Sequence, residues 1–142
     1  METPSPQDAR AMLDQLAADE TAVRYPPLPR WFFPAQAALT AALLLAQTLP
    51  PSDARPATFA VAVAAIVLGG RYWVFRDQVA GVRPSAGDML PFLGGVLGAV
   101  VVCLVVQETT GAWWVWIPGA VVVAGIVLGT GRRYRETYGD AG

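Results

Sequence analysis

Four long apolar runs dominate the sequence, and no charged residue lies at the middle of any of them. The runs cover residues 31–49, 57–75, 89–107 and 112–130, about 19 residues each. At a rise of ~1.5 Å per residue, a helix of this length nearly crosses the ~30 Å hydrocarbon core of a bilayer. The pattern therefore predicts an all-α integral membrane protein, built as a bundle of four transmembrane helices.

The first 30 residues are more polar and predict a short helix outside the membrane. Ser5 can cap its start, Pro6 suits the first helical position, and Asp8 stands where a capping-box acid belongs. Apolar residues then recur at helical spacing until the Pro-rich sequence 26–29 ends the helix near Arg24. Because this amphipathic segment holds more acids than arginines, we expect it to dock on a protein surface, its own or a partner's, and not on anionic lipid.

The distribution of arginine predicts the orientation of the chain. With the N-terminus in the cytoplasm, nine arginines fall on the inner side and only Arg55 on the outer side, as the positive-inside rule requires. We therefore expect a bacterial plasma-membrane protein with both termini cytoplasmic. Residues 1–30 form a helix and linker, 31–130 a transmembrane domain and 131–142 a cytoplasmic tail.

Composition removes several classes of function. The 142-residue chain is 54% hydrophobic and 15% charged, has a net charge of −1 and contains no histidine. Nucleic-acid binding needs a dense positive field, so we expect no nucleic-acid partner. The single cysteine, Cys103, cannot form an internal disulfide, and the sequence has no Walker A, HExxH or GxSxG motif. We expect no cofactor, no metal site and no enzymatic activity.

Small residues recur at the spacing that lets helices approach closely. Gly94 and Gly98 form one GxxxG pair, and Gly125 and Gly129 form another. Helix association in lipid depends on close packing more than on hydrophobic transfer, so we interpret these glycines as helix-packing positions within the bundle. A seam between two copies of the chain is the alternative.

A thin polar stripe follows the first apolar run. Gln36, Thr40 and Gln47 lie within about 40° of one another on a helical wheel at ~100° per residue. Their simplest role is hydrogen bonding between helices, and the alternative is a polar path for a ligand or ion. Arg71 is the only charge inside the predicted spans and lies near the inner interface, where its side chain can snorkel to the headgroups. Pro118 predicts a kink in the fourth span.

Two short sequences give the layout a family resemblance. Pro-Arg-Trp-Phe-Phe-Pro at 29–34 precedes the first run, and Arg-Arg-Tyr-Arg-Glu-Thr-Tyr at 132–138 follows the last. With these, the chain resembles uncharacterised small four-helix integral membrane proteins of high-GC Gram-positive bacteria. Some of those proteins are encoded beside small winged-helix regulators, so the resemblance implies a role in signalling or envelope stress. It implies no catalytic residue.

The polar segments fall on the predicted cytoplasmic side, and this location guides the functional hypothesis. We expect a non-enzymatic accessory, scaffold or regulatory subunit that acts through its cytoplasmic face. Its candidate partners are membrane lipids, a cytoplasmic protein and a second copy of the chain. The alternative is a small oligomeric transporter or channel that uses the polar stripe. Small multidrug-resistance transporters, however, rely on a glutamate in their first span, and none is present here.

Overall fold

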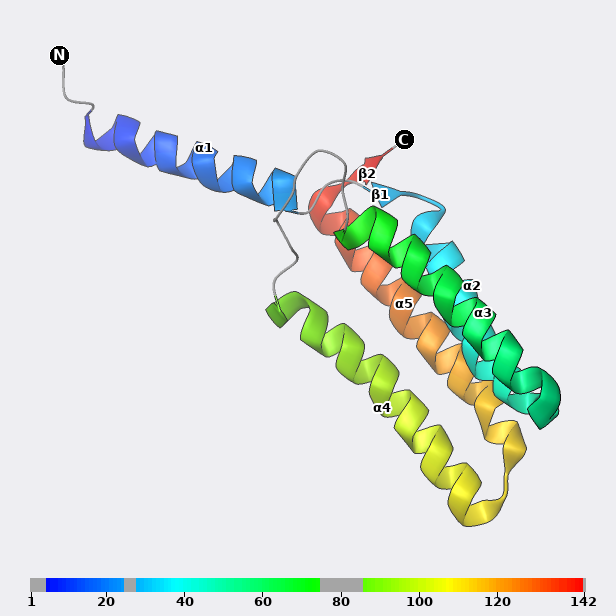
Figure 1. The fold of residues 1–142 in the computed structure, drawn as a ribbon. Helices are drawn as coiled ribbons and strands as arrows, with labels where there is room; N and C mark the ends of the chain where they lie inside the picture. Colours follow the sequence, from blue (N-terminus) through cyan, green and yellow to red (C-terminus); the bar gives the residue numbers. More distant parts are fainter. Residues whose placement is uncertain (1–4, 25–27, 75–85, 142) are drawn as a thin grey trace.

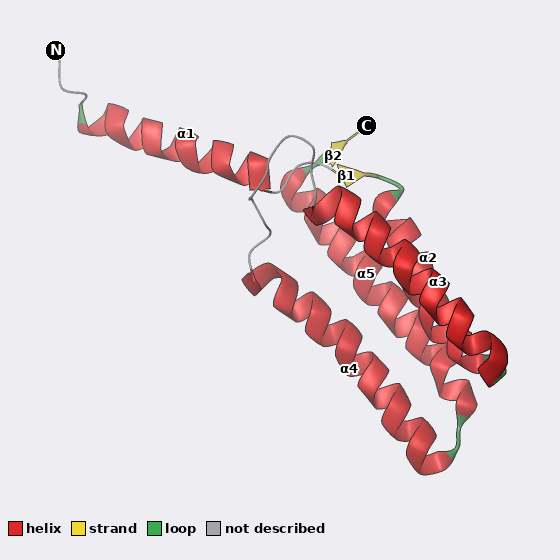
Figure 2. Ribbon diagram, viewed as in Figure 1, coloured by secondary structure: helices red, strands yellow, loops and turns green. Residues whose placement is uncertain are grey.

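The computed structural model describes residues 5–24, 28–74 and 86–141, which are almost entirely helical (Figures 1 and 2). The helices are α1 (Pro6–Arg24), α2 (Phe32–Leu45), α3 (Pro51–Gly69), α4 (Ala86–Thr110) and α5 (Trp116–Tyr138). Shorter helical turns are η1 (Ala46–Thr48), η2 (Gly70–Val74) and η3 (Trp113–Val115), and η2 is π-helical. Two short parallel strands, β1 (Leu28–Pro29) and β2 (Asp140–Ala141), pair with each other beside the ends of α2 and α5.

Helices α2 to α5 run alternately up and down in one bundle. The main contact joins α2 to α5; α3 packs on α2, and α4 packs on α5. Figure 1 shows α4 meeting α5 near their connection and then diverging from it. We call the end where α3 and α5 finish the arginine end, because Arg71, Arg132 and Arg133 are exposed there. Two further predicted inner-side arginines, Arg76 and Arg83, lie outside the described residues.

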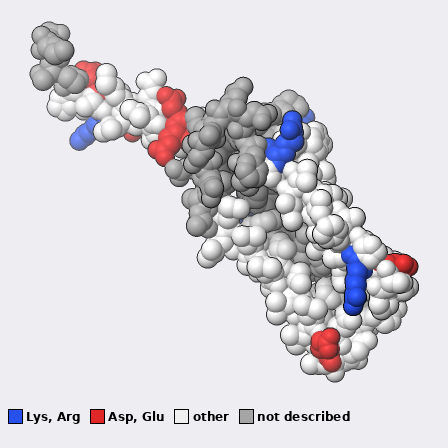
Figure 3. All heavy atoms as spheres, in the orientation of Figure 1, with Lys and Arg blue, Asp and Glu red and all other residues white. Residues whose placement is uncertain are grey.

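In the described part of the chain, three helical stretches are long and apolar enough to cross a membrane. They are Pro51–Tyr72, Met89–Thr110 and Trp113–Tyr138, whereas the apolar stretch Phe32–Thr48 is shorter. Large apolar side chains point away from the bundle: Phe59 and Ile66 of α3 are 73% and 72% exposed. In the view of Figure 3, charged side chains gather toward the two ends of the bundle. An apolar surface of this extent is compatible with a multi-pass membrane protein.

Two helix boundaries differ from the predicted apolar runs. Helix α3 begins before its run, at Pro51, because the Pro50 carbonyl already accepts hydrogen bonds from the N–H groups of Asp53 and Ala54, both at 2.9 Å. Helix α5 continues through the predicted tail to Tyr138 and ends only at Gly139, whose φ is 83°. Hydropathy detects apolar residues, whereas a helix continues through polar ones until a breaker follows.

Pro118, which predicts a kink in the fourth span, lies close to the start of α5. Helix α5 begins at Trp116, so Pro118 lies in its first turn. Backbone N–H groups in the first turn have no carbonyl partner within the helix, and a proline there removes no helical hydrogen bond. The kink itself stays a prediction, because the helical turn η3 leads directly into α5.

Two clusters of buried side chains hold the bundle together, and both join α2 to α5. One lies at the arginine end and contains Leu28, Phe32, Phe33, Ala37, Val127 and Tyr134. The other lies toward the opposite end and contains Leu44, Cys103, Trp116, Ala120 and Val123. Helix α3 contributes no fully buried residue. The α2–α5 contact is therefore the centre of the fold.

Two glycines of α5 allow close contacts with neighbouring helices, Gly119 with α4 and Gly131 with α2. A Cβ at Gly119 would overlap Cys103 Sγ and lie 3.4 Å from Leu44 Cδ2, and a Cβ at Gly131 would overlap the Phe33 ring. Close approach of this kind supplies dispersion contacts, which carry much of helix association in lipid. Cys103 also donates to the Val115 carbonyl at 3.7 Å, so the thiol is part of the packed interior.

Helix α1 extends away from the bundle (Figure 1). At its start, the Asp8 N–H donates to Ser5 Oγ and the Ser5 N–H donates to the Asp8 carboxylate, both at 3.2 Å, which is a reciprocal cap. Met12, Leu13 and Leu16 are 59%, 67% and 67% exposed. The apolar stripe of α1 is therefore not covered by the described part of its own chain.

Candidate functional site

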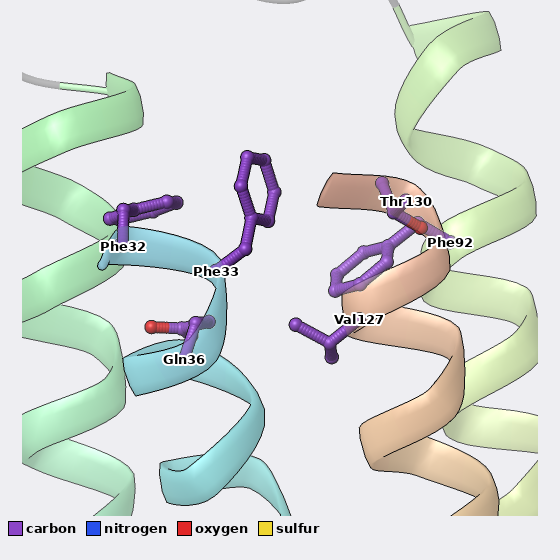
Figure 4. A pocket seen from close by; sticks show the side chains of 7 residues that line it. Phe32, Phe33, Gln36, Phe92, Val127 and Thr130 are labelled. Carbon is purple, nitrogen blue, oxygen red and sulfur yellow. The ribbon is translucent and has the colours of Figure 1, made fainter. Parts of the chain in front are cut away.

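A pocket lies near the arginine end, where four helices meet (Figure 4). It contains about 320 Å³ of empty space, its open mouth included. Its wall is mostly apolar and is formed by Phe32, Phe33 and Gln36 of α2, Gly69 of α3, Phe92 of α4, and Val127 and Thr130 of α5.

Helical spacing places these side chains on the facing sides of their helices. Phe32 and Gln36 are four residues apart on α2, and Val127 and Thr130 are three apart on α5, so each pair shares a face. Figure 4 shows the α2 side chains on one side of the pocket and those of α4 and α5 on the other. Phe32 is held edge-on against Phe33, with ring centroids 5.2 Å apart.

The polar atoms in the pocket wall come from one amide and one hydroxyl group. Gln36 Nε2 donates to the Ala65 carbonyl of α3 at 3.4 Å. Its Oε1 is buried and has no hydrogen-bond partner among the described residues. Thr130 Oγ1 donates to the Ile126 carbonyl at 2.8 Å. An unpaired buried acceptor costs ~1–3 kcal/mol, so the Gln36 amide is a weak point of the packing.

The other two residues of the predicted polar stripe, Thr40 and Gln47, form hydrogen bonds inside the bundle. Thr40 Oγ1 donates to the Gln36 carbonyl at 2.6 Å. Gln47 Nε2 donates to Thr58 Oγ1 of α3 at 2.7 Å and to the Leu43 carbonyl at 3.2 Å. Neither Thr40 nor Gln47 lines the pocket. Gln36 of α2 and Gln47 of η1 therefore both bond to α3, and of the two only Gln36 lines the pocket.

None of the four glycines predicted to pack helices lies at a close contact between the described helices. A Cβ added at Gly94, Gly98, Gly125 or Gly129 would meet nothing within 4 Å in the described part of the chain. Close contacts occur instead at Gly95, where the nearest atom would be Ile126 Cδ1 at 3.3 Å, and at Gly119 and Gly131. None of these three belongs to a predicted GxxxG pair: Gly119 faces Cys103 and Leu44, and Gly131 faces Phe33.

The arginines lie just beyond the pocket on two of its helices. Arg71 follows the lining residue Gly69 by two positions, and Arg133 follows the lining residue Thr130 by three. Both arginines are exposed, and snorkelling of Arg71 stays a prediction. Trp31 stands edge-on to Tyr72 at the same end, with ring centroids 5.3 Å apart.

The side chains of the pocket wall can bind a ligand. Within residues 5–24, 28–74 and 86–141 there is no group of three or more His, Cys, Asp or Glu side chains that could hold a metal ion. The pocket wall offers an apolar surface, an amide and a hydroxyl, but no carboxylate or thiol. Such a wall can select a ligand by shape and by apolar contact.

The chain matches no known protein-family model, and no characterised protein or solved structure is detectably similar to it. The resemblance to small four-helix membrane proteins therefore stays a prediction. Function has to be argued from the geometry of the molecule.

Proposed function

We propose that the chain crosses the bacterial plasma membrane four times, keeps both termini in the cytoplasm and serves as a non-enzymatic accessory, scaffold or regulatory subunit. The arginine distribution supports this orientation, because all arginines except Arg55 fall on one side of the four predicted spans. In this arrangement the arginine end and α1 face the cytoplasm, and the η1–α3 and α4–η3 connections face the outside.

Contacts between the side chains of α2 and α3 support the proposal that the shorter apolar stretch, Phe32–Thr48, also crosses the membrane. The rings of Phe32 and Tyr72 lie 5.6 Å apart at the arginine end, and Gln47 bonds to Thr58 near the other end. Phe32–Gln47 of α2 and η1 thus runs beside Thr58–Tyr72 of α3 and η2. The stretch Pro51–Tyr72 is long enough to span a membrane. Because Phe32–Gln47 runs beside most of that stretch, it covers most of the same membrane thickness.

The observation that carries the functional proposal is the exposure of the apolar stripe of α1. Met12, Leu13 and Leu16 are each more than half exposed on a helix that extends away from the bundle. A helix with an apolar face gains stability by covering it. The acids beside this face, Asp14 and Asp19, disfavour an anionic lipid surface, so a protein partner is the better candidate.

A transporter or channel has less support as an alternative. A polar path needs hydrogen-bonding groups that face a cavity at mid-membrane depth. Thr40 bonds to its own helix and Gln47 bonds to α3, which leaves Gln36 alone beside the pocket.

Affinity purification after detergent extraction tests the proposed role of α1. The double variant Leu13→Ser and Leu16→Ser should lose a co-purifying cytoplasmic protein that the unmodified chain retains. The matched control Gln15→Ser and Ala18→Ser changes two other exposed positions of α1 and should retain it. Identical partners for all three proteins would argue that α1 does not recruit the partner.

A further inference from the structure

We propose that the pocket and the arginines beside it form a binding site for one anionic phospholipid. Part of one acyl chain occupies the pocket, and the phosphate contacts the exposed arginines of η2 and α5. This inference uses the membrane location proposed above, but it is independent of any partner of α1. Loss of the α1 partner and loss of the lipid are therefore separate results in the full chain.

The shape and lining of the pocket suit an acyl chain. Phe32, Phe92 and Val127 give it apolar surface from three helices (Figure 4), and the pocket is partly open. In a bilayer, an open apolar recess between helices is in contact with lipid tails. The pocket is too small for a whole lipid, so only a short part of one chain enters it and the rest of the molecule stays in the bilayer.

The arginines lie where the phosphate group of a phospholipid would be if its acyl chain entered the pocket. Helices α3 and α5 both run toward the arginine end, so Arg71 and Arg133 lie two and three residues beyond the pocket wall, or ~3–5 Å along the helix axis. The phosphate of a phospholipid likewise lies beyond its chains, toward the aqueous side. Basic pockets between transmembrane helices on the cytoplasmic side are known to bind anionic headgroups.

The arginines are available for an anion. Arg71 and Arg133 are exposed and form no ion pair with the described residues. Arg132 pairs with Glu136 at 3.0 Å, but the two side chains are 80% and 62% exposed, so this pair is easily rearranged. A guanidinium group can bind a phosphate through two parallel hydrogen bonds.

Native mass spectrometry of the detergent-solubilised chain tests the proposal. Titration with phosphatidylglycerol and with phosphatidylcholine of the same acyl chains should show one tightly bound phosphatidylglycerol. Arg133→Gln should weaken its binding about fivefold or more, because each basic residue near an anionic lipid contributes measurably to affinity. Arg55→Gln removes the same charge at the opposite end of the bundle and should leave binding unchanged.

A second pair of variants tests the pocket. Gly69→Leu places a side chain in the pocket wall, next to the Gln36 amide, and should abolish the selective binding. Gly125→Leu makes the same exchange at a position with open space around it and should retain it. A melting measurement checks that both variants fold; if Gly69→Leu does not, the Arg133 and Arg55 variants decide the outcome.

Three results would overturn the proposal. Equal affinity for the two lipids would remove the role of charge. Unchanged selectivity in folded Gly69→Leu would show that lipids bind only to the general surface of the bundle. Displacement of the lipid by free glycerol phosphate would show that the site recognises a soluble phosphate and not a phospholipid.

Discussion

The backbone of Gly131 lies against the ring of Phe33, so close that a single Cβ at this glycine would overlap the ring. Phe33 is 5% exposed and belongs to the buried cluster at the arginine end, together with Tyr134. The contact fixes the distance between α2 and α5 directly beside the pocket. Small changes at Gly131 therefore bear on both the stability of the bundle and the shape of the pocket.

We expect Gly131→Ala to destabilise the bundle by ~1–3 kcal/mol, because overpacking forces a large ring and a helix to shift. Gly129→Ala is the matched control: a Cβ there meets open space, and the free energy of unfolding should not fall. Reversible unfolding in mixed detergent measures both. Equal stability of the two variants would contradict the close contact.

The Gln47–Thr58 hydrogen bond should be measurable as a coupling energy. Gln47→Leu and Thr58→Val, combined in a double-mutant cycle, should show a coupling of ~0.6 kcal/mol, which is typical of hydrogen bonds between transmembrane helices. A second cycle of Thr40→Val with Thr58→Val should be additive, since Thr40 bonds to its own helix. Additivity in both cycles would mean that this bond does not join α2 to α3.

The open glycines of α4 give a prediction about a second copy of the chain. Because a Cβ at Gly98 would meet no atom of the described residues within 4 Å, Gly98→Leu should leave the stability of the monomer unchanged. If copies associate through this face, the added side chain should weaken the dimer by ~1–3 kcal/mol. Fluorescence energy transfer between labelled copies in vesicles measures the effect, with Leu104→Phe, an exposed position about 120° away around α4, as control. Equal transfer in both variants would exclude this seam.

Much of the helical framework could be predicted from the sequence, because a long apolar run has few alternatives to a helix. The runs 57–75, 89–107 and 112–130 each lie largely within one of the three long apolar helices. Their ends could not be predicted from hydropathy. Helix α3 begins at Pro51 because of proline chemistry, and α5 continues to Tyr138 because nothing before Gly139 stops it.

The pocket could be predicted only in part. Gln36 stood out as a polar residue in an apolar run, and Arg71 as a charge in a predicted span. Phe92 and Val127 looked like ordinary apolar residues, and only the packing of four helices brings them together. The close contacts of Gly119 and Gly131 depend on the side chains opposite them, which one sequence does not identify.

The central claim is that the chain crosses the membrane four times with α1 and the arginine end on the cytoplasmic side. Single exposed cysteines introduced as Thr21→Cys, Ser52→Cys and Thr137→Cys test it by labelling with a membrane-impermeant maleimide, since native Cys103 is buried. In intact cells the reagent should label Ser52→Cys alone, and the other two should react only after permeabilisation. Labelling of Thr21→Cys and Ser52→Cys from the same side would contradict the claim, because Phe32–Thr48 would then not cross.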